Sequence, residues 1–208
     1  MAAVRDVSER PCDSRLPQVC LDETSTQRGG EGRPPTPLAP GQPAQAADAY
    51  VRKGVANLFV VTEPLRGWRH VTVTDPRTAV DCAPVIRVLV AVHYPDAERI
   101  VLVLDNLNPP TPAARYAAFP PAAAHRLAAR LEWPYTPPHG RWLNSAAVEF
   151  SVLARQCLDR RIAEQSLLKG AIAMGQARRT QAGTGVRWRF RTAAARVKLH
   201  RVSPSIPE

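Results

Sequence analysis

The stretch that most constrains the fold is an unbroken apolar run that stops at an acidic residue. Residues 101–104 are all Val or Leu, and Asp105 follows them at once. A continuous apolar tract of this length is typical of a strand buried on both faces of a sheet, so the acid lies at its carboxyl end. Residues 19–21 repeat the pattern and lead into Asp22. Two strand-end carboxylates, together with a helix expected to begin at Trp142, indicate a metal site.

Each polar residue near these strands also has a simpler interpretation. An aspartate that follows a strand often caps a turn, and the residues alone leave that alternative open for Asp22 and Asp105. Asn106 and Asn144 could orient the acids or bind a phosphate, but an asparagine beside a turn is explained equally well as a cap or an Asx turn. His139 could approach the site, although a lone histidine in a turn is more often a surface residue. A metal site requires Asp22 and Asp105 to lie side by side.

The size and charge of the chain indicate one basic domain. The chain has 208 residues and is 45% hydrophobic, which suffices for one domain with a core and is short for two. It carries 28 Lys and Arg against 18 Asp and Glu, a formal net charge of +10. Such an excess favours a polyanionic partner through phosphate contacts and counterion release. The alternative is a solvated, arginine-rich surface without a partner.

Cysteine spacing and hydropathy limit the location of the protein. Its cysteines form no C-x-x-C pair and no Cys/His cluster with zinc-ligand spacing, so we expect small buried side chains rather than zinc ligands or disulfides. No stretch approaches about 18 consecutive apolar residues, and no N-terminal segment has the pattern of a signal peptide. We therefore expect a cytoplasmic protein without a membrane partner, associated in a bacterium with the nucleoid.

The pattern along the chain predicts alternating strands and helices. Residues 1–16 lack any period, and Gly and Pro are so dense within 28–47 that a loop or disorder is expected there. Apolar runs and alternation predict strands at 19–23, 55–61, 68–74, 100–104 and 132–136. Helical spacing predicts helices at 78–94, 112–119, 121–131 and 142–158, with Pro84 kinking the first or delaying its start. This order fits a mixed α/β sheet flanked by helices.

Seven short segments, taken in order, resemble one known family. They are Cys20-Leu-Asp-Glu23, Asn57-Leu-Phe-Val60, Trp68-Arg-His-Val71, Arg77-Thr-Ala-Val-Asp81, His93-Tyr-Pro-Asp-Ala-Glu-Arg-Ile100, Val103-Leu-Asp-Asn-Leu-Asn108 and Trp142-Leu-Asn144. Together they look like a mariner-like insertion-sequence transposase of the DDE superfamily of endonucleases. The resemblance continues through 155–161 to 187–190, so it covers most of the chain.

The resemblance implies a ribonuclease-H-like fold. The mixed sheet of this fold, flanked by helices, carries two aspartates on neighbouring strands and a third acid on a following helix. Such sites hold Mg²⁺ or Mn²⁺, commonly as a pair of ions about 3.5–4 Å apart that assists DNA strand cleavage and strand transfer. We expect this catalytic domain at 17–177, a basic C-terminal segment at 178–208, and transposon-end DNA as the substrate. The expected protein partner is a second copy, in a homodimer, or an intact transposase.

The three acids of the family carry over only in part. Asp22 matches the first acid and Asp105 the second, as catalytic residues and metal ligands. The family has its third acid, a glutamate, three positions after the Asn of Trp-Leu-Asn, and here that position is Ala147. Glu149 lies two positions further, and since a helix advances about 100° per residue, its side chain points roughly 200° away. A substitute role for Glu149 would require a rotated or shifted helix.

The missing acid predicts a weak or inactive enzyme. Two carboxylates would have to hold the metal ions, so metal affinity and catalysis should both fall. Since Met1 lies only 21 residues before Asp22, without the helix-turn-helix segments of full-length relatives, the chain resembles a truncated and degenerate copy. One alternative is a non-catalytic DNA-binding or dimerising remnant. Another is a ribonuclease-H-like nuclease or an unrelated α/β domain, in which Asp22 and Asp105 lie too far apart to share a metal cluster.

The most basic part of the chain is its C-terminal quarter. Residues 186–191 alternate apolar side chains with Arg187, Arg189 and Arg191, so an extended segment would present a row of guanidinium groups. We predict that these arginines and Lys198 bind DNA phosphates. The alternative is an edge strand or loop whose arginines are only solvated.

Overall fold

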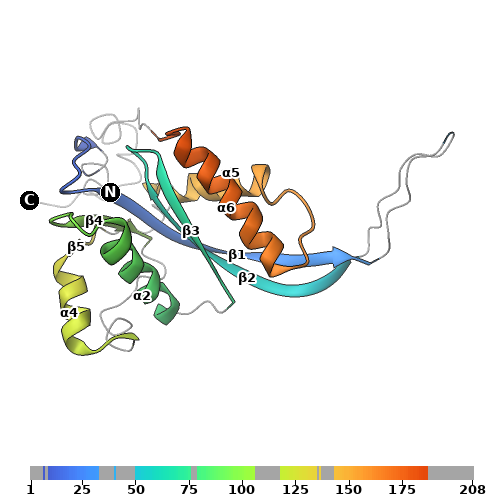
Figure 1. The fold of residues 1–208 in the computed structure, drawn as a ribbon, viewed down its shortest axis with the longest axis horizontal. Helices are drawn as coiled ribbons and strands as arrows, with labels where there is room; N and C mark the ends of the chain where they lie inside the picture. Colours follow the sequence, from blue (N-terminus) through green and yellow to red (C-terminus); the bar gives the residue numbers. More distant parts are fainter. Residues whose placement is uncertain are drawn as a thin grey trace, which may run out of the picture.

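A single sheet with helices on both faces forms the centre of the molecule (Figure 1). The computed structural model describes residues 7, 9–32, 40, 50–75, 79–105, 118–134, 136 and 143–186. The strands are β1 (Gln18–Glu31), β2 (Tyr50–Glu63), β3 (Trp68–Thr74), β4 (Ile100–Leu104) and β5 (Leu131–Glu132). The helices are α2 (Ala79–Val88), the π-helical turn η1 (Leu89–His93), α4 (Pro121–Ala129), α5 (Ala146–Gln156) and α6 (Gln165–Gln181).

The five strands form a mixed sheet in the order β3-β2-β1-β4-β5. β1 pairs antiparallel with β2, and β2 pairs antiparallel with β3. β1 pairs parallel with β4, and β4 pairs parallel with β5. β1 is therefore the central strand and separates the antiparallel half of the sheet from the parallel half. The predicted mixed α/β sheet flanked by helices is confirmed.

Alternation along the strands divides the core into two layers. Val19 and Leu21 of β1 pack on one face with buried side chains of α2 and η1. Cys20 of β1 and Val103 of β4 pack on the other face with buried side chains of α5 and α6. Figure 1 shows the same division, with α2 and α4 on one side of the sheet and α5 and α6 on the other. Because both faces are covered, every residue of β4 is buried, and this accounts for its unbroken apolar run.

β1 and β2 extend beyond the other strands as a long antiparallel pair (Figure 1). Their pairing continues to Glu31, which lies opposite Tyr50. The strand predicted at 19–23 is therefore too short, and the loop predicted at 28–47 is wrong for residues 28–31. Polar and glycine residues form a strand here because backbone hydrogen bonds to β2 do not depend on side-chain type, and this pairing outweighs intrinsic propensity. The remainder of the predicted loop lies mostly outside the described residues.

Pro84 lies inside α2 without ending it. The sequence predicts a kink or a delayed start at this proline, but α2 already begins at Ala79 and leads directly into η1. Cys82, Val85 and Ile86 are buried, whereas Pro84 is exposed. Burial of that apolar face offsets the one backbone hydrogen bond that a proline cannot donate.

The elements after β4 match their predictions in part. α4 confirms the helix predicted at 121–131, and α5 begins four residues after the predicted start at 142. β5 includes only the first residue of the strand predicted at 132–136. The helix predicted at 112–119 lies almost wholly outside the described residues. In the part of the chain that the structure describes, none of the helices has the length and apolar character needed to cross a bilayer.

α6 is a helix of 17 residues that has no counterpart in the sequence-based prediction. It consists mostly of polar and small residues, and its buried side is a narrow stripe at helical spacing, formed by Leu168, Ala171, Ile172 and Gly175. This stripe is the signal from which the helix could have been predicted. α6 passes through residue 177, the predicted end of the catalytic domain, and its last turn includes Arg178 and Arg179.

α5 and α6 meet at a glycine. A Cβ atom on Gly175 would overlap the Sγ of Cys157, so the absence of a side chain permits the close approach. Gly170, on the same helix, has no atom within 4 Å of an added Cβ. Of the two glycines of α6, Gly175 is therefore tightly packed and Gly170 has open space beside it.

Four rings gather where β3 meets η1. The ring centroids of His70 and His93 are 4.7 Å apart, and that of Trp68 lies 4.8 Å from His93 and 5.5 Å from Tyr94. Burial lowers the pKa of both histidines, and the neighbouring His70 lowers that of His93 further. Tyr94 donates a hydrogen bond of 2.6 Å to Oε2 of Glu63. His70 is thus part of the packing between β3 and η1.

All four cysteines are free thiols. Burial raises the pKa of Cys20 to about 11 and that of Cys82 to about 12, so both stay protonated near neutral pH. Cys157 is partly buried. Cys12 is exposed, so the expectation that all four are buried is wrong for this residue.

The two glycines of α6 should respond in opposite ways to alanine. Gly175→Ala places a methyl group against Cys157, so we expect the free energy of unfolding to fall by about 1–3 kcal/mol. Gly170→Ala adds a methyl group in open space and improves helix propensity, so we expect a rise of about 0.5–1 kcal/mol. Urea unfolding followed by circular dichroism measures both. An unchanged Gly175→Ala variant would contradict the close packing of α5 on α6.

Acid should destabilise the fold through the histidine pair. Because folding lowers both pKa values, the unfolded chain binds more protons, and stability present above about pH 6.5 is lost as the pH falls through the folded values. We expect the urea midpoint to drop between about pH 7.5 and about pH 5.5, and to drop less in His93→Gln. His125→Gln, at an exposed position on α4, is the control and should keep the wild-type dependence. An identical drop in His93→Gln would show that the pair does not carry the effect.

Candidate functional site

Asp22 and Asp105 lie side by side at the end of the parallel pair of β1 and β4. The last registered pair is Leu21 opposite Leu104, and each aspartate is the next residue along its strand. Since neighbouring strands are about 4.8 Å apart, the backbones of the two acids are adjacent. Asp22 lies within β1 rather than at its end, because β1 continues in its pairing with β2. The alternative fold, in which Asp22 and Asp105 lie too far apart to share a metal cluster, is therefore wrong.

Both aspartates lie on the face of the sheet that α5 and α6 cover. Asp22 is two residues from Cys20, and Asp105 is two residues from Val103, and both of these apolar side chains pack in that layer. Asp22 is buried, with 2% of its surface exposed, whereas Asp105 is partly buried. Glu23 follows the opposite alternation, and its charge helps to raise the pKa of the buried thiol on α2. This placement of Glu23 agrees with the strand pattern.

Backbone and hydroxyl groups donate hydrogen bonds to the two carboxylates. Oδ1 of Asp22 accepts a hydrogen bond from the backbone N–H of Glu23 at 2.9 Å. The hydroxyl of Thr136 donates to Oδ1 of Asp105 at 3.3 Å, and the Thr136 amide donates to the carbonyl of Leu104 at 3.0 Å. Thr136 is 1% exposed. Nothing in the sequence marks Thr136 as a site residue, because its contact depends on how the chain returns after β5.

Asn144 ties the start of α5 to β1. Its side-chain amide donates a hydrogen bond of 2.8 Å to the carbonyl oxygen of Leu21, the residue before Asp22. Its Oδ1 accepts a hydrogen bond of 3.1 Å from the backbone N–H of Ala146, two residues further on, as in an Asx turn. Asn144 has no exposed surface. One side chain therefore forms an Asx turn at the start of α5 and also supports the strand that carries an acid.

Ala147 is the second residue of α5 and lies three positions after Asn144. The helix start is in contact with β1, because hydrogen bonds from Ser145 and Ala146 reach Cys20 and oppose the rise of its pKa by burial. The first turn of α5 therefore lies against β1 just before Asp22. A methyl group cannot bind a metal ion, so position 147 adds no ligand to the two acids.

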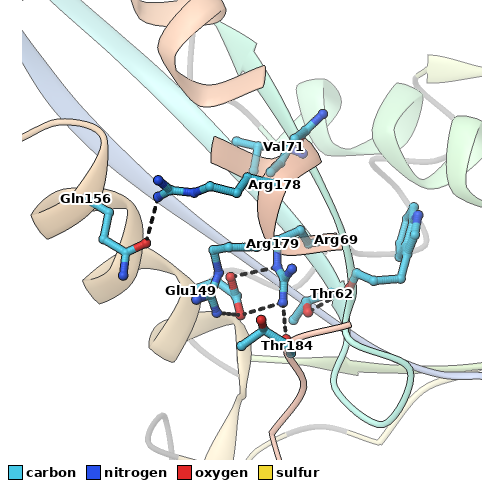
Figure 2. Close-up of polar contacts among 10 residues, drawn as sticks. Thr62, Arg69, Val71, Glu149, Gln156, Arg178, Arg179 and Thr184 are labelled. Atoms are coloured by element: carbon cyan, nitrogen blue, oxygen red, sulfur yellow. Dashed lines mark hydrogen bonds and ion pairs between the residues drawn. The ribbon is translucent and has the colours of Figure 1, made fainter. Parts of the chain in front are cut away.

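Glu149, the acid of α5, is held by two arginines (Figure 2). Its Oε2 lies 2.9 Å from Nε of Arg69 on β3, and its Oε1 lies 3.0 Å from a terminal nitrogen of Arg179 on α6. Arg69 also donates a hydrogen bond to the carbonyl of Thr184. The side chains of Glu149 and Arg69 are 2% and 3% exposed. Both carboxylate oxygens of Glu149 are therefore engaged in ion pairs.

The arginine cluster around Glu149 sets the rotation of α5 about its axis. Glu149 lies about 200° around the helix from Ala147, so holding it against β3 and α6 turns position 147 away from them. Burial lowers the pKa of Arg69, and the nearby Glu149 opposes this shift. Loss of one partner would leave a buried charge without compensation, which is strongly destabilising. Together with Asn144, the cluster defines where the first turn of α5 lies.

Several predicted site residues lie outside the described residues. They are Asn106, His139, Arg187, Arg189, Arg191 and Lys198. Their roles stay predictions. The structure does describe the two arginines at the start of the predicted basic segment, and their side chains make different contacts. Arg179 pairs with Glu149, whereas Arg178 is exposed and donates a hydrogen bond of 3.2 Å to Oε1 of Gln156.

Asp22 and Asp105 offer a metal ion two carboxylates. Across the described ranges, no group of three or more His, Cys, Asp or Glu side chains is placed to hold a metal. Carboxylate oxygens are the ligands that Mg²⁺ and Mn²⁺ prefer, so the donor chemistry of the pair fits these ions. Two acids on neighbouring strands suit one cation whose remaining ligands are water molecules.

Comparisons with known proteins agree with this geometry. Residues 17–169 match the sequence profile of a family described as DDE superfamily endonuclease. No curated protein matches the chain. Among solved structures, the chain is similar to the crystal structure of the Mos1 mariner paired end complex with Mn, at a TM-score of 0.52 and 16% sequence identity.

The similarity to the Mos1 structure covers 88% of this chain and 54% of the other. The chain thus spans about half the length of that protein. At this identity the similarity concerns the fold, and it confirms the ribonuclease-H-like sheet flanked by helices that the sequence predicts.

Glu149→Gln should destabilise the fold strongly. An amide cannot neutralise Arg69 and Arg179, so we expect the free energy of unfolding to fall by about 3–5 kcal/mol. Glu132→Gln is the control, because Glu132 pairs with Arg10 at 3.4 Å on an exposed surface and should contribute less than about 1 kcal/mol. Urea unfolding of both variants gives the comparison. Equally small losses would contradict a role of the cluster in holding α5.

Proposed function

Because the chain belongs to the family of DDE superfamily endonucleases, we propose that it is the catalytic domain of a mariner-like transposase. The observation that carries the proposal is the adjacency of Asp22 and Asp105 at the end of the parallel strand pair. In this function the two aspartates are catalytic residues for DNA strand cleavage and strand transfer. The similarity of the fold to that of the Mos1 mariner structure supports it.

Asp22 and Asp105 would hold Mg²⁺ or Mn²⁺ in this function. A divalent cation bound there would polarise phosphate oxygens and lower the pKa of an attacking hydroxyl group. The similar solved structure is described as a complex with Mn, which supports a divalent metal. Thr136 would hold the Asp105 carboxylate through its hydroxyl, and Asn144 would keep β1 and α5 in a fixed relation.

Ala147, at the position of the third acid, would make this enzyme weak or inactive. Two carboxylates alone would bind the metal less tightly, because affinity rises with the number of charged ligands. Glu149 could replace the third acid only by leaving Arg69 and Arg179, and a buried and a partly buried arginine would then lose their counter-charge. According to this proposal, the chain is a catalytically impaired member of a family of active transposases.

DNA, in the form of transposon ends, is the proposed substrate. The net charge of +10 supports a polyanionic partner. The similar solved structure is described as a paired end complex. Arg187, Arg189, Arg191 and Lys198 are the proposed phosphate contacts in the C-terminal segment. A homodimer or an association with an intact transposase, in the bacterial nucleoid, belongs to the same proposal.

A non-catalytic DNA-binding or dimerising remnant is the second candidate function. Ala147 and the ion pairs of Glu149 favour it, because together they leave the site with two acids. The two functions share the fold and the partner. They differ in whether the acid pair still supports DNA cleavage.

Ala147→Glu should restore a third carboxylate and, with it, metal-dependent DNA cleavage. The new side chain enters at the first turn of α5, close to Asp22, so we expect the affinity for Mn²⁺ to rise by about tenfold or more. Nicking of supercoiled plasmid DNA in Mn²⁺ or Mg²⁺ measures activity, and calorimetry measures metal binding. The wild-type chain should give few nicks or none.

Two further variants identify the cause of any restored cleavage. Ala147→Gln has a similar size without the charge and should stay inactive. Asp105→Asn in the Ala147→Glu background should abolish the restored cleavage. Cleavage by the wild-type chain that is lost in Asp105→Asn would show that the chain is not impaired. A folded Ala147→Glu variant that binds DNA without cutting it would favour the remnant.

A further inference from the structure

A groove lined by arginines lies between the end of α5 and the middle of α6. Its volume is ≈ 550 Å³, and Arg155, Arg160 and Arg178 line it with a single acidic residue, Asp159. All three arginines are exposed. We propose that this arginine groove binds the phosphate backbone of DNA at a place separate from the pair of aspartates.

Two of the three guanidinium groups are already oriented by hydrogen bonds. Arg178 donates from a terminal nitrogen to Oε1 of Gln156 at 3.2 Å, a contact that joins α6 to α5 (Figure 2). Nε of Arg155 donates to the carbonyl of Ser151 at 3.2 Å. Each bond uses one of the five N–H donors of an arginine and leaves the others for a ligand. Side chains that are ordered beforehand lose less conformational entropy when they bind.

Arg178 and the adjacent Arg179 have different surroundings on α6. Arg179 is 15% exposed and pairs with Glu149, so it is not available to a ligand. Arg178, one residue earlier, is exposed and faces the groove. The small residues Ala171 and Gly175 form part of the lining of the same groove. The groove therefore combines positive charge with room for a backbone strand.

The spread of the arginines favours a polyanion over a small anion. They come from α5, from the segment after it and from α6. A small anion is typically enclosed by convergent donors in a concave site, whereas a DNA backbone is met by separate, solvent-exposed donors along its length. DNA is therefore the ligand that this arrangement fits.

The arginine groove and the aspartates are close enough for one duplex to reach both. Arg155 lies eight residues after Ala147 on α5, which is about 12 Å at a rise of about 1.5 Å per residue. DNA advances about 3.4 Å per base pair, so this separation corresponds to about three or four base pairs. The proposal that the groove binds DNA rests on the proposed function, in which DNA is the substrate of the two aspartates.

The salt dependence of DNA binding tests the arginine groove. The groove variant carries Arg155→Gln, Arg160→Gln and Arg178→Gln. The control variant has the same net charge and carries Arg87→Gln, Arg99→Gln and Arg126→Gln, at exposed positions on α2, before β4 and on α4. Fluorescence anisotropy with a labelled duplex, from about 50 to 200 mM salt and in EDTA, gives the slope of log Kd against log salt. Circular dichroism verifies that both variants fold, and Arg160→Gln alone serves if the triple variant does not.

We expect the slope to fall by about 0.9 for each lost phosphate contact, hence by about 2 to 3 in the groove variant and much less in the control. Equal slopes in the two variants would overturn the groove, and so would a wild-type chain that binds no DNA. Displacement of the duplex by inorganic phosphate at constant ionic strength would also overturn it, because the groove would then hold a small anion. Since EDTA removes metal, a failure of Ala147→Glu to cut DNA would defeat the proposed function without affecting this result.

Discussion

The parallel register between β1 and β4 is the constraint on which the rest of the structure depends. It places Asp22 and Asp105 next to each other, one step beyond the pair of Leu21 and Leu104. A shift of one residue would turn one of the acids to the opposite face of the sheet and would exchange the side chains that β4 contributes to the two layers of the core. Because helices cover both faces, the packing of the core and the position of the acids are the same property of the fold.

α5 is joined to this sheet by two polar contacts that do different things. Asn144 fixes where the helix begins, and the cluster of Glu149 with Arg69 and Arg179 fixes how it is turned. Buried ion pairs lose much of their attraction to desolvation, so we assign this cluster to geometry rather than to net stability. The result is a helix whose first turn lies beside the acids and whose last turn borders the arginine groove.

The strand at 100–104 and its aspartate could be predicted because a buried parallel strand must be apolar throughout. The family motifs extended this to the whole fold. The strand at residues 28–31 could not be predicted, because it forms through backbone pairing with β2 rather than through its side chains. α6 has only a narrow buried stripe, and exposed apolar side chains such as Leu167 and Met174 obscure its spacing. The partners of Glu149 could not be predicted, since they lie 80 and 30 residues away in the chain.

By itself, the sequence determined what depends on residue type at fixed spacing. This includes the apolar runs that lead into Asp22 and Asp105 and the alanine at position 147. The tertiary structure alone decided which charged side chains turn inward. Arg178 and Arg179 are neighbours of the same type, yet one borders the arginine groove and the other is partly buried beside Glu149. An opposite charge stabilises a charge that is taken out of water, and here that partner comes from another helix, which local spacing does not specify.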